Sequence, residues 1–466
     1  MEAARQPPDR IKGESVNRRG LLQMMAASAA AGLGGSRRVQ AQEKMARATR
    51  GMPSPKIKDV SVIATQPAGA RLTVVKVVTD QDGLYGYGCA TFTQRADAVV
   101  VAVEKYLRPL LIGKPTDRVE DAWQACYNSS YWRNGPVLNN AISGVDEALW
   151  DIKGRQAGMP VYDLWGGKCR EAALTFANAG GAAPKDVVEG VRQAMARGYQ
   201  HVRVGAGYGR RPGGAGGAGH AEPAVPKGLH EGPVFERAAN LRLMLQIFEA
   251  CRKELGFEVE LMHDMHERYS PREAIQFVKD CEQFKLYFLE DPLSPEDNDW
   301  YRQMRAQCAT PIAMGELFNS PHEWTPLIVE RLIDYIRCHV SQVGGVTPAR
   351  KIASLAEQFG VKTAWHGPND VSPVGHTAQL HLDLASYNFG IQEGGIITGV
   401  LAEVFKGCAT FKDGYLWAND APGWGIEVDE KMAAKFPYGA SEQGERGRLN
   451  GGWGELRLSD GTLIKQ

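Results

Sequence analysis

From about Ala172 onward the chain alternates short apolar runs with amphipathic stretches, and this alternation constrains the fold more than any other feature. The apolar runs are AALTFA, HVRVG, VELMH, LYFLE, PIAMG, DYIRCHV, VKTAW and FGIQ. Segments of helical period separate them, such as SPREAIQFVKDCEQF and TPARKIASLAEQFG. Eight strands that alternate with helices favour a parallel α/β barrel over an open sheet. We therefore expect a TIM-like barrel over residues 171–400.

Residues 57–170 predict a separate α+β unit. Three short strands are expected in IKDVSVIATQ, ARLTVVKVVTD and LYGYGCATF. A helix follows in which apolar residues of AISGVDEALWDIKGRQAG fall on one face, and Gly158 and Pro160 predict its end. The last segment, residues 401–466, is rich in Gly and Trp, and we expect it to pack back on this first domain.

Composition excludes some classes of partner. Lysine plus arginine equals aspartate plus glutamate at 54 each, so no global field attracts nucleic acid or an anionic membrane. The eight cysteines form no CxxC pair, which argues against a zinc knuckle and against a dense disulfide framework. The expected partner is a small molecule that local charges recognise.

The first 50 residues differ from the rest of the chain. NRRGLLQMMAASAAAGLGG places Arg18 and Arg19 before a short apolar run, Leu21 to Leu33, and VQA follows at 39–41 like a small-residue cleavage site. This resembles a twin-arginine signal peptide, and the run is too short to span a membrane. We expect a periplasmic or exported protein. The alternative is a cytoplasmic protein with a disordered tail that carries an Arg-Arg pair by chance.

Three carboxylates stand at the ends of successive predicted strands. Asp264, Glu290 and Glu316 are spaced 26 residues apart, about one strand–helix unit each. The strands of a parallel barrel end at the face that holds its active site, so these side chains should converge there. A single such carboxylate is more often a helix N-cap. Three in register predict an all-oxygen metal site, which suits Mg²⁺ or, as a substitute, Mn²⁺.

The stretch LMHDMHERYS contains two histidines around Asp264. Side chains alternate along a strand, so His266 should share the face of Asp264 while His263 takes the other. His266 is the expected proton-transfer group, and His263 is expected to pack against a helix or cap it.

Later strands continue the same register. His366 in AWHGP and Glu393 in GIQEGG end the seventh and eighth runs, and on the sixth run either Arg337 or His339 could reach the same mouth. An arginine there could hold a substrate carboxylate, although an ion pair in the barrel wall is an equal alternative. The second run ends in Arg203, which cannot serve as a base unaided because its pKa is above about 12. It could lower the pKa of a neighbouring tyrosine.

A glycine-rich stretch between Gly205 and Pro233, GAGYGRRPGGAGGAGHAEPAVPKGLHEG, follows the second barrel run. It stands where an active-site lid would be expected. A flexible insertion without function is the alternative.

These motifs together resemble a known family. The chain is similar to the mannonate dehydratase branch of the enolase superfamily from about residue 57 to about residue 440. The resemblance rests on YWRNGPVLNNAISGVDEALWDIKGRQAGMPVYDLWGG, HDMHERYSP, FLEDPLSPED, MGELFNSP, IRCHVSQVGGVTPARKIA, AWHGPNDVSP and APGWGIEVDE. It implies a capping α+β domain on a (β/α)7β barrel, and Mg²⁺ held by Asp264, Glu290 and Glu316. It also implies a homo-oligomer.

The implied reaction removes the proton α to the carboxylate of a sugar acid and expels a β-hydroxyl, which gives a 2-keto-3-deoxy sugar acid. His266 would be the general acid, and a tyrosine paired with Arg203 would be the base. Tyr208 is the leading candidate for that tyrosine. His366, His220 or His230 is the runner-up.

The chain departs from the branch in its expected substrate cradle. The branch's His-Ala-Asn-Gly reads Phe176-Ala177-Asn178-Ala179 here, and its capping-domain asparagine corresponds to Thr93. The loop holds one tyrosine, Tyr208, closer to Arg203 than the branch pattern has it. We expect substrate contacts from Arg337, Glu393 and Asn178, and a substrate related to mannonate or gluconate.

Two rival functions stay open. One is another reaction of the superfamily, such as epimerisation or racemisation, although IRCHVSQ lacks the aspartate that would make His366 a strong base. The other is a sugar-acid binding or sensing protein that turns over weakly.

Overall fold

The computed structural model describes residues 53–206, 234–368, 371–439 and 456–465. Apart from the first two of these residues, they belong to one compact unit that begins at Pro55. Tyr208, His220, His230 and the expected signal peptide lie outside the described residues.

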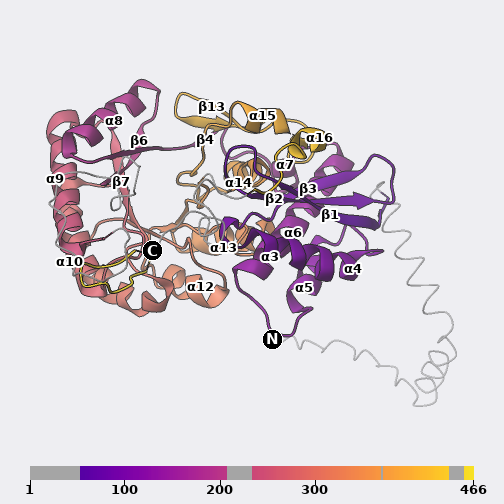
Figure 1. Ribbon diagram of the computed structural model, residues 1–466, viewed down its shortest axis with the longest axis horizontal. Coiled ribbons are helices and arrows are strands. Elements are labelled where there is room, and N and C mark those ends of the chain that lie inside the picture. The colour runs from indigo at the N-terminus through magenta and orange to yellow at the C-terminus, as the bar shows by residue number, and fades with distance from the viewer. Residues whose placement is uncertain (1–52, 207–233, 369–370, 440–455, 466) are drawn as a thin grey trace, which may run out of the picture. The chain divides into compact units, whose positions relative to one another are not determined.

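The N-terminal part of this unit is an antiparallel meander covered by helices, shown in indigo and purple in Figure 1. Its strands are β1 (Ile57–Thr65), β2 (Leu72–Thr79) and β3 (Tyr85–Cys89). Its helices are η1 (Thr93–Arg95), α3 (Ala96–Ala102), the π-helical η2 (Val103–Leu107), α4 (Arg108–Leu111), α5 (Val119–Asn128) and α6 (Pro136–Ala157). Gly158, with φ of 68°, ends α6 in the left-handed region, as the sequence predicts.

Helix α6 lies very close to strand β3. A Cβ at Gly88 would stand 2.1 Å from the carbonyl oxygen of Gly144 in α6, so this approach requires glycine. The helix also buries three acidic residues. Asp146 accepts hydrogen bonds from the backbone N–H and the hydroxyl of Thr347 in the barrel. Glu147 accepts a hydrogen bond from the backbone N–H of Cys89. Asp151 accepts hydrogen bonds from the backbone N–H groups of Tyr87 and Trp424. One helix thus connects the meander, the barrel and the C-terminal segment.

The barrel sheet contains seven parallel strands in the order β11-β10-β9-β8-β7-β6-β5. They are β5 (Ala177–Gly181), β6 (His201–Ala206), β7 (Glu260–Asp264), β8 (Phe288–Glu290), β9 (Ile312–Met314), β10 (Tyr335–Ile336) and β11 (Lys362–Thr363). The helices between and after them are α8 (Pro184–Ala196), α9 (Arg237–Leu255), α10 (Pro271–Asp280), η3 (Cys281–Phe284), η4 (Pro295–Trp300), α11 (Tyr301–Gln307), α12 (Pro321–Val329), α13 (Val346–Gln358) and α14 (Pro373–Ala385). Figure 1 shows α8, α9 and α10 outside strands β6 and β7.

The expected first and eighth strands differ in detail. In AALTFA, Ala173–Leu174 forms a strand, β4, which pairs with β14 (Tyr415–Trp417) outside the barrel, and only the last residue, Ala177, belongs to the barrel strand β5. FGIQ forms no regular strand; instead isolated parallel bridges join Phe389 to Thr363 and Gln392 to Thr175. These bridges connect the two edges of the sheet, so the segment still closes the barrel. The α/β barrel with its N-terminal capping domain is therefore confirmed.

The C-terminal segment divides between two contacts. Its elements are α15 (Val400–Val404), β12 (Phe405–Lys406), β13 (Thr410–Lys412), β14, β15 (Glu427–Val428) and α16 (Glu430–Ala433). The short helix α7 (Val161–Leu164) lies earlier in the chain, between α6 and β4. Part of the C-terminal segment packs on the capping domain, where Thr65 Oγ1 donates to Ala433 O. Residues 456–465 contact the barrel instead, which differs from the expectation that the whole segment packs on the capping domain.

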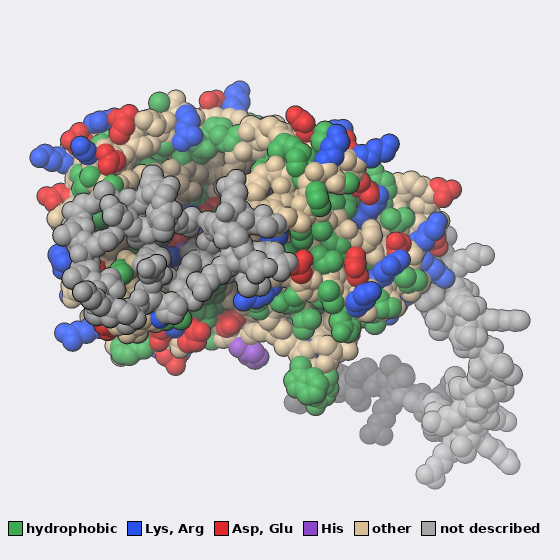
Figure 2. All heavy atoms as spheres, viewed as in Figure 1, with side chains coloured by type: hydrophobic (Ala, Val, Ile, Leu, Met, Phe, Trp, Pro, Cys, Tyr) green, Lys and Arg blue, Asp and Glu red, His purple; other side chains and the backbone are tan. Residues whose placement is uncertain are grey.

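Acidic and basic side chains are interspersed over the described part of the face in Figure 2. Among the described residues, no helix is long and apolar enough to cross a membrane.

Candidate active site

The three expected metal ligands stand where their strands end. Asp264 is the last residue of β7 and pairs with Glu290, the last residue of β8. Glu316 lies two residues beyond β9. The chain turns sharply after each of them or just before: Asp291 has φ of 39° and Gly315 of 138°. Non-glycine residues rarely adopt positive φ, and such conformations concentrate at functional sites.

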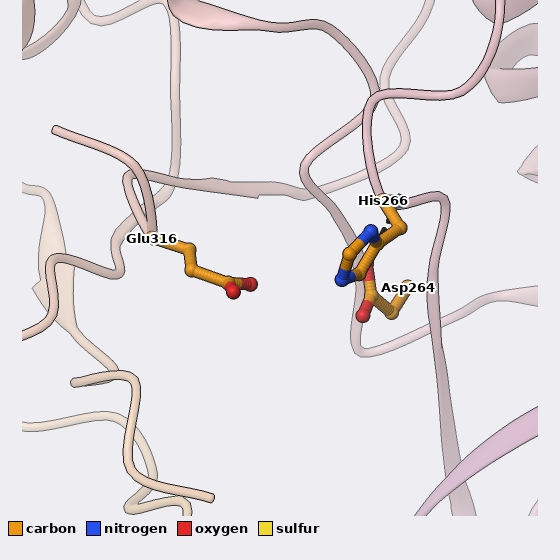
Figure 3. A group of neighbouring side chains, drawn as sticks. All are labelled: Asp264, His266 and Glu316. Carbon is orange, nitrogen blue, oxygen red and sulfur yellow. Dashed lines mark hydrogen bonds between the residues drawn. The ribbon is translucent and has the colours of Figure 1, made fainter. Parts of the chain in front are cut away.

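His266 lies beside Asp264, as expected, but a turn and not strand alternation places it there. Strand β7 ends at Asp264, and His266 and Glu267 have φ of 55° and 59°. The backbone N–H of His266 donates to Asp264 Oδ1 at 2.8 Å. Figure 3 shows the carboxylate of Glu316 pointing toward this pair. Ligand atoms of all three residues lie within 4.8 Å of one another.

His263 points away from this group. Its Nδ1 lies 2.8 Å from Val204 O, and its ring packs against Phe248 of α9 and Phe277 of α10. The expectation that His263 packs against a helix is confirmed.

Arg203 on β6 is the most connected cation of the site. Its Nη1 lies 3.0 Å from Glu290 Oε1 and 3.8 Å from Asp264 Oδ2, and its Nη2 lies 2.9 Å from Glu393 Oε1. Its Nε donates to Asn178 Oδ1 at 2.9 Å. Asn178, expected to contact substrate, therefore orients Arg203 in this structure. Burial lowers the pKa of Arg203, but the three carboxylates outweigh burial and raise it well above its usual value.

Arg337, just after β10, is fully buried and makes the wall ion pair that was one of its two expected roles. Its Nε lies 2.6 Å from Glu290 Oε1, and its Nη2 pairs with Glu393 Oε2. Glu393 thus lies between two guanidinium groups. Burial opposes ionisation of Glu393, yet Arg203 and Arg337 hold its pKa well below the usual range.

His366 occupies the other side of Glu316. Its Nε2 lies 3.4 Å from Glu316 Oε1 and 3.9 Å from Glu393 Oε2. The ring of His339 lies 5.2 Å away, and no described residue hydrogen-bonds to Nδ1 of His366. Glu316 therefore lies between His266 and His366, which come from opposite parts of the barrel.

The donor set fits a divalent cation. A second group of possible ligands, Asp264, Glu290 and Asp291, shares Asp264 with the first, so the expected trio is divided between two groups among the described residues. Burial raises the pKa of Glu290 to about 7 despite the two arginines. Burial and neighbouring carboxylates raise the pKa of Glu316 and of Asp291 well above their usual values. This buried negative charge exceeds what Arg203 and Arg337 neutralise, and a hard cation with oxygen ligands would relieve it.

Comparisons with known proteins agree with this geometry. Residues 45–166 match the mandelate racemase/muconate lactonizing enzyme N-terminal domain, and residues 186–432 match the enolase C-terminal domain-like family. The D-galactonate dehydratase family member RspA of Pantoea ananatis is 48% identical over 87% of this chain and 98% of its own length. A family member from Paenibacillus is 44% identical over 88% and 99%.

The chain belongs to the D-galactonate dehydratase family of the enolase superfamily. A crystal structure of an enolase from Pantoea ananatis with bound D-gluconate and Mg is 47% identical, with a TM-score of 0.84, and covers 88% of this chain and 100% of its own. Membership confirms the expected enzyme class, a hydro-lyase, at the level of the family. These relatives carry the galactonate name rather than the mannonate name.

The sequence pattern did not predict three side chains that lie at the site. Asp291 belongs to the second ligand group, and its place directly after Glu290 in FLEDP could have indicated it. Glu267 is buried beside the site, and burial together with Glu316 raises its pKa to about 9. Phe176 was noted only as a departure from the related branch. Its ring lies 5.3 Å from the guanidinium carbon of Arg203 and 6.0 Å from that of Arg337. Thr93, in the capping domain, is buried.

Proposed function

We propose that this protein is a Mg²⁺-dependent dehydratase of a gluconate-like sugar acid that forms a 2-keto-3-deoxy sugar acid. The observation that carries the proposal is the group of Asp264, Glu316 and His266 within 4.8 Å, with Glu290 paired beside Asp264. A relative that is 47% identical holds D-gluconate and Mg, which supports this class of substrate.

Asp264, Glu290 and Glu316 would hold the metal, one per subunit, with Mn²⁺ as a possible substitute. When bound, the cation would stabilise the negative charge that develops on the substrate carboxylate. His266, beside the ligands, would hold the proton that the departing β-hydroxyl takes. The positive charges of Arg203 and Arg337 would help to balance an anionic substrate.

The base is assigned to Tyr208 assisted by Arg203. Arg203 stays charged, because Glu393, Glu290 and Asp264 raise its pKa, so it can favour a tyrosinate but cannot itself accept a proton. His366 is the second candidate, and its distance of 3.4 Å from Glu316 supports access to the same mouth. Its Nδ1 lacks a carboxylate partner among the described residues, which disfavours a racemase-type dyad.

The test is a screen of the mature protein with Mg²⁺ against C5 and C6 sugar acids, with semicarbazide detection of 2-keto-3-deoxy products. A product should form with the native protein and disappear in Glu290→Gln. Glu357→Gln, an exposed change on α13, should leave the product unchanged. A sugar acid that binds without giving product would instead favour the binding or sensing role, and C2 deuterium exchange without loss of water would favour an epimerase.

We also propose that residues 1–50 are a twin-arginine signal and that the folded protein is exported to the periplasm. The motif NRRGLL and the VQA site support this proposal. Replacing both Arg18 and Arg19 by lysine should keep the full-length protein in the cytoplasm, while the native chain should appear in the periplasm without its first 40 or so residues. Sedimentation of the mature chain would test the expected homo-oligomer.

A further inference from the structure

The last described residues form a small hairpin, which we call the C-terminal hairpin, residues 456–465. Leu458 N donates to Thr462 O at 2.9 Å, and Ile464 N donates to Leu456 O at 3.0 Å. The side chains of Leu456 and Ile464 are buried in the main apolar core. This hairpin is therefore anchored to the barrel and is not a loose end. In Figure 1 it is the yellow segment beside α10.

One edge of the hairpin holds the segment that leads into α9. Arg457 forms a parallel bridge with Val234, and Phe235 N donates to Arg457 O at 2.8 Å. Ser459 N donates to Glu236 Oε1 at 3.0 Å. The ring of Phe235 in turn packs 5.8 Å from that of Tyr269, in the turn that follows His266.

The end of the hairpin holds the loop after β8. Lys465 Nζ donates to Ser294 Oγ and lies 3.2 Å from Glu296 Oε2 and 3.5 Å from Asp297 Oδ2. Ser294 is buried and stands four residues after Glu290. The residues between them, from Asp291 to Leu293, are also buried. The short, packed segment should therefore transmit a displacement of Ser294 to Glu290.

We infer that the C-terminal hairpin positions the catalytic loops after β7 and β8, and that Lys465 is a positioning residue for Glu290 and Asp291 through Ser294. Lys465 touches neither ligand. Its charge lies against an acidic turn, Glu296 and Asp297, and thereby holds together side chains that would otherwise repel one another. Because the hairpin contacts the loop after β8 directly and the loop after β7 through Phe235, a change at Lys465 should affect metal binding before it affects global folding. This inference rests on the proposed function for its metal-binding and kinetic consequences, whereas the exchange of residues 291–297 tests the positioning alone.

Lys465→Met tests it, with Lys465→Arg as the conservative variant and Lys412→Met, an exposed change on β13, as the matched control. Hydrogen exchange of the segment 291–297 and Mg²⁺ affinity by calorimetry are measured first. We expect exchange at least about fivefold faster and Mg²⁺ affinity about three- to tenfold weaker in Lys465→Met, at an unchanged melting temperature. Lys465→Arg should recover most of both.

Native exchange in 291–297 for Lys465→Met would overturn the inference, as would an equal change in Lys412→Met. Neither exchange nor metal binding requires turnover. If the native protein gives no product in the sugar-acid screen, the proposed function is refuted. The exchange of residues 291–297 would still test whether the hairpin positions the loop after β8. With a substrate in hand, Lys465→Met should lower kcat/KM in proportion to metal occupancy, so that excess Mg²⁺ restores it.

Discussion

Arg203 Nη1 lies 3.0 Å from Glu290 Oε1, so an arginine contacts an expected metal ligand directly. The same nitrogen is 3.8 Å from Asp264. A guanidinium so close to two ligands balances part of their charge and repels a cation bound between them.

Arg203→Met should therefore bind Mg²⁺ more tightly while losing turnover. Removing one positive charge beside the ligands should raise the affinity about tenfold, or roughly 1.4 kcal/mol. Calorimetric titration of the variant measures this. Arg192→Met, which removes an exposed ion pair on α8, should leave affinity unchanged. Weaker Mg²⁺ binding in Arg203→Met would show that the arginine orients the ligands more than it competes with the metal.

His266→Asn should separate the two halves of the proposed reaction. Without the general acid, product formation should fall by about a hundredfold or more, because the hydroxyl departs without a proton. Exchange of the C2 proton with deuterium oxide should continue, since the base is still present. Proton NMR of substrate in deuterium oxide follows both events. His322→Asn, on α12, serves as the control, and loss of both events together would assign His266 to proton abstraction.

Asp146→Asn should alter how stability depends on pH. Burial raises the pKa of Asp146 from an ordinary 3.8 to about 7. Between pH 3.8 and about pH 7, the folded state therefore holds a proton on Asp146 that the unfolded state releases. The resulting stability is fully present below about pH 3.8 and is lost as pH rises through 7, for a total on the order of 4 kcal/mol. The variant should lose less stability than the native protein between pH 5 and pH 8. Thermal unfolding at several pH values checks this, and parallel curves would contradict it.

Gly88→Ala should destabilise the capping domain by at least about 2 kcal/mol, because its Cβ would meet a backbone oxygen of α6 at 2.1 Å. Urea unfolding measures the loss. Gly439→Ala places its Cβ in open space and should be neutral. A tolerated Gly88→Ala would mean that α6 can move away from the meander at little cost.

The barrel could be predicted from the sequence, and so could the carboxylates that meet at its mouth, because the spacing between strand ends is a local property of the chain. Asp264, Glu290 and Glu316 needed only the repeat length to be placed at one mouth. Ion pairing was harder to foresee. Nothing in the spacing shows that Glu393 lies between Arg203 and Arg337, since these residues come from three separate strands or loops.

Backbone geometry also escaped the pattern. Alternation along β7 gave the correct neighbour for Asp264, although the strand stops there and His266 reaches its place through positive φ. The position of the C-terminal hairpin was mispredicted because composition says only that a segment is irregular. Which surface it covers depends on individual contacts such as that of Lys465 with Ser294.

The contact of Lys465 with the loop after β8 has a consequence for how the protein folds. Lys465 and Ser294 are 171 residues apart in the sequence, so a long loop of chain must close before this contact can hold the segment that follows Glu290. A chain shortened before residue 456 could form most of the barrel and would still lack this contact.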